Sequence, residues 1–256
     1  MSFDERQMLR YARHIVLPEV GGAGQAKLLS ASVLVVGAGG LGSPLLLYLA
    51  AAGIGRLGVV DDDTVDLSNL HRQIVHPTDH VGLAKTTSAK RALTALNPDV
   101  DVVLHEGRLT PDNAASVVEN YDLVADGSDN FATRDAVHET CFCLKKPLVS
   151  AAVQGVEGQL STYKAHLGPP HPCYRCIFPD KPPADLIPSC AEGGVLGPVV
   201  GVMGSLQAVE VIKELLGRGD SLSGTLLLYD GLSTAFSRIG VARRPACPVC
   251  AGASAK

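Results

Sequence analysis

The chain has 256 residues, 46% of them hydrophobic, and a formal net charge of −4. That length and apolar content are sufficient for one buried core. The absence of a basic block argues against nucleic acid or an anionic membrane as a partner. The N-terminal sequence MSFDERQMLR lacks the apolar segment of a signal peptide, and no apolar run reaches the ~18–20 residues that span a bilayer. We therefore expect a cytoplasmic protein whose seven cysteines are reduced, which favours metal binding or catalysis over disulfides.

The N-terminal segment is expected to be helical over residues 3–13 and again over 25–30. Pro18 and the glycines at 21, 22 and 24 separate the two stretches, because both residue types interrupt helices. The pair Arg13-His14 ends the first helix, where charged side chains are usually just solvated.

Residues 33–61 predict a strand, a glycine-rich turn, a helix and a second strand. The strand VLVV is followed by Gly37, Gly39 and Gly42 in G-x-G-x-x-G order, which allows a tight turn and a close approach to phosphate. The helix over 43–52 would direct its N-terminal amides at the anion. Asp61 closes the second strand, where an acidic residue can hold ribose hydroxyls. This combination favours nucleotide binding over the alternative, a simple helix–strand packing device.

The segment DDTVDLSNLHRQIVHP, directly after Asp61, is too polar for a core and carries groups suited to binding. Asn69, Arg72 and Gln73 could share one helical turn, since residues three and four apart lie on one face. Lys85 opens the next amphipathic helix, over roughly 83–96. Either cation could be merely solvated. Together, however, a guanidinium fork and an ammonium point charge could clamp a polyphosphate.

The strand expected over 121–126 runs into the segment DGSDN, and a helix begins near Phe131. Asp126 and Asp129 therefore lie at the carboxyl end of a strand, where open α/β sheets bind ligands. Asp129 could cap the following helix, or it could be a carboxylate for magnesium and a nucleotide; the cations in the preceding units favour the second reading.

The pattern changes after Pro147. Strand-like stretches at PLVSAAVQG and EGQLSTYKA, and later at 225–229 and 235–239, indicate a mixed sheet with a long apolar helix over about 198–216. The sequence therefore predicts an α/β fold with a Rossmann-like doubly wound sheet, parallel in its first half and mixed in its second.

The cysteines divide into two C-x-x-C pairs and three others. One zinc ion could be held by four thiolates in a closed structural site, supplied by Cys173, Cys176, Cys247 and Cys250. A thioredoxin-like redox pair is the alternative, but neither motif has the expected βαβ context. Cys141 and Cys143 fall within a helix and are expected to be small core residues. Cys190 lies between proline-rich and glycine-rich stretches, so an accessible thiol with a covalent role is plausible.

The ordered motifs resemble those of the ThiF/MoeB-type adenylyltransferases, bacterial relatives of the ubiquitin-activating enzymes. The match covers residues from about 8 to 250 and comprises RYARHIVLP, VLVVGAGGLGSP, DDDTVDLSNLHRQ, GLAKTTSA, DGSDNFATR, PCYRC, CAEGGVLGP and CPVC. This resemblance implies ATP-dependent adenylylation of the C-terminal glycine carboxylate of a small ubiquitin-like sulfur-carrier protein ending in Gly-Gly. That carrier could serve molybdopterin or thiamin biosynthesis, tRNA thiolation or another pathway.

The resemblance also assigns roles by matching motifs. Asp61 would hold the ribose, and Asp129 with Asn130 the magnesium and nucleotide. The phosphates would be bound by Asn69, Arg72, Gln73 and Lys85. Arg13 would reach the partner subunit's nucleotide in a homodimer. Residues 1–256 would form one adenylation domain, with N-terminal helices over 1–30, a nucleotide-binding half over 31–150, and a carrier-binding half with the zinc site over 151–250.

Two other functions are compatible with parts of this pattern. A nicotinamide-dependent oxidoreductase would explain the glycines but not Arg72, Lys85, Asp129 or the zinc thiolates. A non-catalytic scaffold for a ubiquitin-like protein would have no need of the intact polar set. No rhodanese-like sequence follows Cys250, so we expect sulfur to come from a separate donor such as a cysteine desulfurase or a rhodanese.

Overall fold

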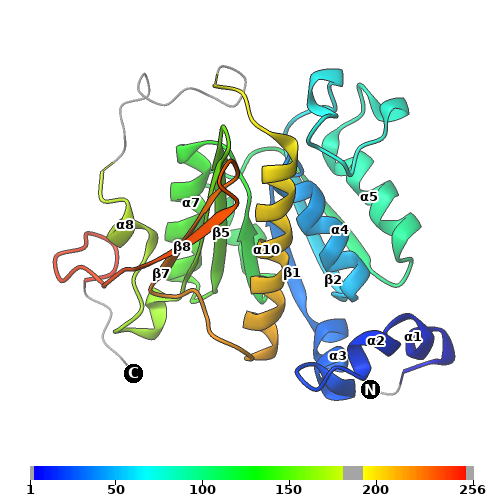
Figure 1. Cartoon of the computed structure of the whole chain (residues 1–256), viewed down its shortest axis with the longest axis horizontal. Helices are drawn as coiled ribbons and strands as arrows, with labels where there is room; N and C mark the ends of the chain where they lie inside the picture. The colour runs from blue at the N-terminus through cyan, green and yellow to red at the C-terminus, as the bar shows by residue number, and fades with distance from the viewer. Residues whose placement is uncertain (1–2, 181–192, 252–256) are drawn as a thin grey trace.

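The computed structural model describes residues 3–180 and 193–251. Its eight strands form a single sheet in the order β3-β2-β1-β4-β5-β6-β7-β8 (Figure 1). The first five strands are parallel and the last three antiparallel, so the predicted mixed sheet is confirmed. The strand bounds are β1 Ser32–Val36, β2 Arg56–Asp61, β3 Asp101–Glu106, β4 Leu123–Asp126, β5 Leu148–Gln154, β6 Glu157–Tyr163, β7 Thr225–Asp230 and β8 Ala235–Gly240.

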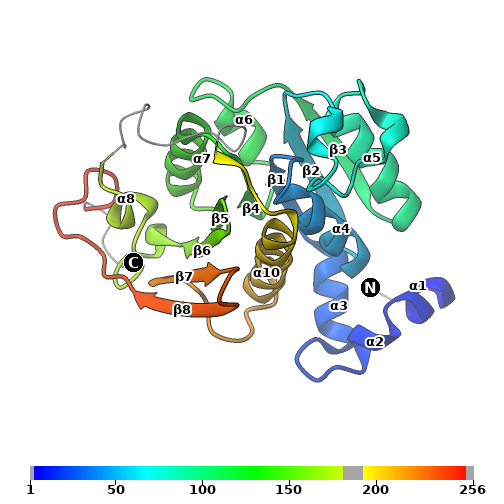
Figure 2. The same cartoon turned by 45° about the horizontal axis from the view of Figure 1, so that its top comes forward.

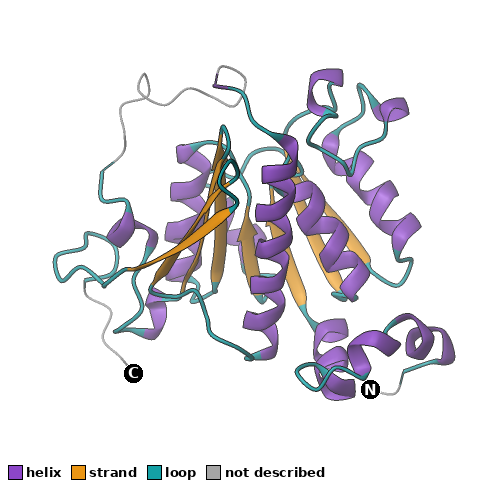
Figure 3. Cartoon of the chain, viewed as in Figure 1, coloured by secondary structure: helices purple, strands orange, loops and turns teal. Residues whose placement is uncertain are grey.

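Helices cover both faces of this sheet, as a doubly wound fold requires (Figures 2 and 3). One face packs against α4, α5 and α10, and the other against α6 and α7. The helix bounds are α1 Glu5–Arg10, α2 Ala12–Ile15, α3 Gly21–Ser30, α4 Gly42–Ala52, α5 Lys85–Leu96, α6 Ala114–Val118, α7 Phe131–Cys143, α8 Tyr174–Ile177 and α10 Gly197–Leu216, with single 3₁₀ turns η1 Leu67–Asn69, η2 Thr78–His80 and η3 Ala165–Leu167.

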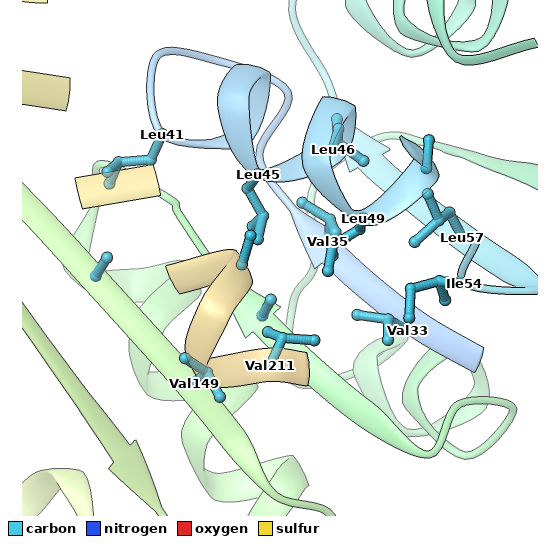
Figure 4. Close-up of a cluster of buried hydrophobic side chains, with 14 of the residues drawn as sticks. Val33, Val35, Leu41, Leu45, Leu46, Leu49, Ile54, Leu57, Val149 and Val211 are labelled. Carbon is cyan, nitrogen blue, oxygen red and sulfur yellow. The ribbon is translucent and has the colours of Figure 1, made fainter. Parts of the chain in front are cut away.

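The central strand β1 shows why the sheet is covered twice. Val33 and Val35 belong to the core cluster beneath α4 and α10, whereas Leu34 and Val36 belong to the cluster beneath α6 and α7. Successive side chains of a strand point to opposite faces, so an uninterrupted apolar run needs apolar cover on both sides. Figure 4 shows Val35 beside Leu49 of α4 and Val33 beside Ile54, with Leu45 of α4 above Val211 of α10.

The N-terminal helical stretch is broken at Tyr11, which separates α1 from α2. Its ring is buried and fills the space above Gly53, the C-cap of α4, where an added Cβ would lie 2.5 Å from the ring. Its hydroxyl accepts a hydrogen bond from Asn97 Nδ2 at 2.9 Å. The tyrosine therefore fixes α1 and α2 to the C-terminal end of α4.

The prediction for Cys141 and Cys143 is half wrong. Both lie in α7, but Cys141 is buried and Cys143 is exposed. Two residues that are two positions apart on a helix point in different directions, so they cannot both face one core.

None of the helices in the described ranges combines the length and the apolar content that a membrane span requires.

Candidate active site

The carboxyl ends of β1, β2 and β4 border a cavity of about 1020 Å³. The glycine-rich turn leads directly from β1 into α4. Gly37 has φ +94°, which L side chains rarely adopt, and Gly42 lies so close to the turn that a Cβ would be 1.9 Å from the Gly37 carbonyl oxygen. Gly39 lines the cavity itself. Gly37 and Gly42 therefore fix the shape of the turn. Gly39, which has no side chain, leaves its backbone accessible to a ligand in the cavity.

Asp61 braces this turn from the end of β2. Its carboxylate accepts hydrogen bonds from the backbone N–H of Ala38 at 2.7 Å and of Asp63 at 2.9 Å. Burial raises the pKa of Asp61, against the opposing effects of the Lys85 charge and of the two backbone donors. Asp61 lines the cavity next to the glycine turn.

Lys85 is buried at the start of α5, with its ammonium in the cavity wall. Nζ contacts Asp63 Oδ2 at 2.8 Å, and that carboxylate is largely exposed. Arg108 also lines the cavity and pairs with Asp62 at 3.1 Å. The Arg108–Asp62 pair is exposed on both sides, and exposed pairs contribute little to stability, so an incoming anion can replace Asp62 at small cost.

Arg72 and Gln73 also line the cavity. Both backbone N–H groups bond to the Asn69 carbonyl at 3.0 Å, so the three residues share a turn as predicted. Gln73 is buried, and its Oε1 has no hydrogen-bond partner among the described residues. A buried amide oxygen without a partner is costly, so Gln73 Oε1 is an acceptor that a donor group of a ligand can satisfy. Asn69 holds this turn through its backbone carbonyl. It is not among the described residues that line the cavity.

Asp126 and Asp129 have different surroundings, although both follow β4. Asp126 is buried, and its carboxylate accepts bonds from Ser128 N and Oγ, Ser150 Oγ and Arg134. Arg134 also donates to the carbonyls of Ser128 and Ala151. Every carboxylate oxygen of Asp126 is therefore occupied by the protein. Its role is to hold the loop that carries Asp129.

Asp129 is exposed and lines the cavity. The helix cap is its neighbour Asn130, whose Oδ1 accepts from Thr133 N at 2.9 Å. The interpretation of Asp129 as a capping residue is therefore wrong, because α7 begins one residue too late for it. No side chain in the described ranges bonds to the Asp129 carboxylate, which leaves it available to a ligand.

Sequence reasoning missed His76 and Arg134. His76 is buried; its Nε2 bonds to the Ala38 carbonyl at 2.9 Å and its Nδ1 to Ser88 Oγ at 2.8 Å. Since a carbonyl only accepts, Nε2 must carry the proton. Burial lowers the pKa of His76, which keeps the ring neutral. The ring ties the glycine turn to α5. Arg134 lies one helical turn after Asn130. Its presence in the DGSDNFATR motif was the only indication in the sequence that it lies near this site.

The cavity continues beyond the nucleotide loops into the antiparallel half of the sheet. Its wall includes residues of β6, β7 and β8, and also of α8, among them Gln159, Leu228, Asp230, Ser237 and Tyr174. Its volume is at the upper end of the ~300–1,000 Å³ typical of small-molecule sites. There is consequently space for a second substrate beside a nucleotide.

The two C-x-x-C pairs meet although Cys173 and Cys247 are 74 positions apart in the sequence. The Sγ–Sγ distances are 3.8 Å for Cys173–Cys176, 3.4 Å for Cys173–Cys247 and 3.5 Å for Cys176–Cys250, and all four side chains are buried. Thiolates at ~2.3 Å from a tetrahedral metal would be about 3.8 Å apart. The cluster therefore has the composition and spacing of a metal site.

Besides Asn69, two predicted site residues lie apart from the cavity or outside the described ranges. Arg13 is exposed on α2, which lies beyond the amino ends of the strands (Figure 1). Cys190 falls within residues 181–192, outside the described residues. The structure therefore brings together Gly37, Gly39, Asp61, Arg72, Gln73, Lys85, Asp129 and Asn130, with Gly42 directly behind the turn.

A glycine turn at the carboxyl end of β1, with cations and a carboxylate lining the same cavity, is an arrangement typical of nucleotide-binding α/β proteins. The chain matches the ThiF family over residues 11–249 and belongs to that family.

Relatives match this sequence over nearly its whole length. A sulfur carrier protein adenylyltransferase of Thermus thermophilus is 49% identical over 252 residues, which are 98% of this chain and 93% of that protein. An adenylyltransferase and sulfurtransferase MOCS3 of Aedes aegypti is 49% identical over 97% of this chain. The chain spans about half the length of the MOCS3 relatives, 56% in that case.

Among solved structures, E. coli MccB crystallised with MccA-N7isoASN is similar in fold. Its TM-score is 0.82 at 26% sequence identity, and the match covers 94% of this chain and 74% of that one.

Proposed function

We propose that this protein adenylylates the C-terminal carboxylate of a small ubiquitin-like sulfur-carrier protein, with ATP as the nucleotide donor. The observation that carries the proposal is the convergence of Arg72, Lys85 and the unpaired Asp129 on a glycine turn, in a cavity that extends to the antiparallel half of the sheet. The name of the Thermus thermophilus relative supports the same reaction.

The reaction needs charge neutralisation more than a base. A glycine carboxylate is already ionised at pH 7, so one of its oxygens can attack the α-phosphorus directly. A new bond forms between the carboxylate oxygen and the α-phosphorus. The bond between the α-phosphorus and the oxygen that bridges it to the β-phosphate breaks, and pyrophosphate leaves with that oxygen. The obstacle is to bring two anions together, which Arg72 and Lys85 overcome by neutralising charge and fixing the reacting atoms in line. No P-loop sequence is present to do this.

Asp129 is proposed to hold magnesium together with the phosphates. Of the carboxylates at the ends of β2 and β4, Asp61 accepts two backbone bonds, Asp62 and Asp63 pair with cations, and Asp126 is used internally. Asp129 alone of this set has no described partner, and oxygen ligands are those that magnesium prefers. When bound, the ion neutralises charge on the phosphates.

The four cysteines are proposed to hold one structural zinc ion. At Cys247 the effect of burial is outweighed by backbone hydrogen bonds from Cys250 and Val249, which lower the pKa to about 7, whereas burial raises the pKa of Cys173 and of Cys250. The four converging sulfur atoms, and not these shifts, therefore carry the proposal of a zinc ion. Metal-binding thiols must stay reduced, which is consistent with a cytoplasmic location.

We propose that Arg13 acts in the partner subunit of a homodimer. Tyr11 anchors α2 at the C-terminal end of α4, whereas the cavity is at its N-terminal end. The 11 residues of α4 separate these ends by about 16 Å, too far for Arg13 to reach its own cavity. Mixing Arg13→Ala with Asp129→Ala chains should therefore restore activity, because one site of each heterodimer regains both groups. No recovery after verified subunit exchange would contradict action between subunits.

Residues 31–150 are proposed as the nucleotide-binding half and residues 151–250 as the carrier-binding half. After adenylylation, Cys190 is proposed to take part in sulfur transfer, with a cysteine desulfurase or rhodanese as the donor. Which pathway the carrier serves depends on the carrier that binds.

Pyrophosphate exchange tests the proposed function. Labelled pyrophosphate should enter ATP only when a Gly-Gly-ending carrier is present, since exchange requires reversible formation of the acyl adenylate. A nicotinamide-dependent oxidoreductase would show no exchange, and a scaffold would bind the carrier without exchange. A carrier truncated by its last glycine is the matched control. Absence of exchange with every small Gly-Gly protein of the same cytoplasm would refute the proposal.

A further inference from the structure

The single turn of α8 lies between the cysteine cluster and the cavity. Cys173 and Cys176 contribute two of the four sulfur atoms. Tyr174 and Ile177, from the same turn, line the cavity. The metal cluster and the substrate cavity therefore share one short element, and a shift of that turn changes both.

The remaining residue of the turn, Arg175, faces α7. It is 8% exposed, and its Nη2 donates to Asp135 Oδ1 at 2.5 Å. The two side chains are 10% and 11% exposed. A buried charge is strongly disfavoured once its partner moves away, so this pair fixes the distance between α8 and α7.

Asp135 directly follows Arg134 on α7, and the two side chains hold different parts of the protein. Arg134 donates to Asp126 Oδ2 at 3.4 Å and to the Ser128 carbonyl, next to Asp129. A continuous series of contacts thus runs from Cys176 through the Arg175–Asp135 pair and α7 to the loop of Asp129. Each link is a buried ion pair or a rigid helical turn.

We propose that Arg175 is a positioning residue which, through Asp135, transmits the fixed geometry of the cysteine cluster to α7 and the Asp129 loop. The role of Asp129 in this inference rests on the proposed function. The contacts that join the cysteine cluster to α7 and the Asp129 loop do not depend on that function. The cysteine cluster then contributes to the position of Asp129 as well as to the stability of the fold.

The test uses Asp135→Asn and the conservative Arg175→Lys in the full-length, metal-loaded protein. Both should retain wild-type zinc content, because no sulfur ligand changes. Asp135→Asn should lower the saturating rate of pyrophosphate exchange roughly 10-fold, since small misplacements near reacting atoms have large effects on rate. KM for ATP should change much less. Arg175→Lys, which keeps the charge but loses the fork, should fall between wild type and Asp135→Asn.

Glu214→Gln is the matched control. Lys164 and Glu214 form a pair with similar burial, 15% and 8% exposed, joined at 2.9 Å, but Glu214 is on α10, on the opposite face of the sheet from α7. Its loss should lower the melting temperature as much as Asp135→Asn does without lowering the saturating rate.

Amide hydrogen exchange in the first turn of α7 provides a readout independent of activity. Protection there should fall in metal-loaded Asp135→Asn and in chelated wild type, but not in Glu214→Gln. Should wild type show no pyrophosphate exchange with any carrier, the proposed function fails, and this measurement alone decides the inference. Unchanged α7 protection in a zinc-containing Asp135→Asn protein, or an unchanged saturating rate in an otherwise active one, would overturn it.

Discussion

The glycine turn offers a sharp test, because its second and third glycines have different surroundings. At Gly42 an added Cβ would lie 1.9 Å from the Gly37 carbonyl oxygen, a backbone atom that cannot rotate away. Close carbon–oxygen contacts are ~3.3 Å, so Gly42→Ala forces the turn and α4 apart by more than about 1 Å. At Gly39 the nearest atom to an added Cβ is Gln73 Nε2 at 3.6 Å, an ordinary contact.

These distances give opposite expectations for stability. Overpacking of this kind costs ~1–3 kcal/mol, and in a chain of this size each kcal/mol lowers Tm by roughly 2–4 °C. Gly42→Ala should therefore unfold ~2–12 °C below wild type. Gly39→Ala should unfold at the wild-type temperature, because its methyl group enters the cavity and not the core.

Activity should fall in both variants for different reasons. In Gly42→Ala the displaced turn misplaces the phosphates, and a 1 Å error costs on the order of 100-fold in rate. In Gly39→Ala the methyl group stands between the backbone and the phosphates, so KM for ATP should rise. Calorimetry and pyrophosphate exchange on both variants complete the comparison. A Gly42→Ala protein with wild-type Tm, or a Gly39→Ala protein with wild-type KM for ATP, would refute this account of the turn.

Four other substitutions test the remaining roles. Arg72→Ala and Asp129→Ala should each remove ~2–4 kcal/mol of transition-state stabilisation, or ~30- to 1000-fold in exchange rate, with Tm unchanged; near-normal rates in either variant would contradict the clamp. Cys247→Ser should lose both the metal, measured by elemental analysis, and thermal stability, and full metal content would reject a shared site. Cys190→Ala should keep pyrophosphate exchange and lose sulfur transfer, because adenylylation needs no thiol. A collapse of exchange in folded Cys190→Ala protein would show that the two steps are not separate.

The sequence by itself determined the strands and the position of the glycine turn, but not every helix boundary. The expectation that the glycines at 21, 22 and 24 precede a helix over 25–30 is wrong, because α3 begins at Gly21 and includes all three. The run Val33–Val36 and the spacing of Gly37, Gly39 and Gly42 are local patterns, and β1 and α4 begin within a residue of the predicted positions. Asn69, Arg72 and Gln73 share a turn for the same reason, since residues three and four apart are held together by the helical repeat itself.

Tertiary structure alone decided which of several similar side chains is available to a ligand. Asp126 and Asp129 are indistinguishable in the sequence, yet Ser150 and Arg134 occupy the first and leave the second free. Arg175 meets Asp135 across 40 positions of sequence, and the two cysteine pairs meet across 74. Such contacts follow from strand order and helix packing, which bring distant segments together, and no local periodicity contains that information.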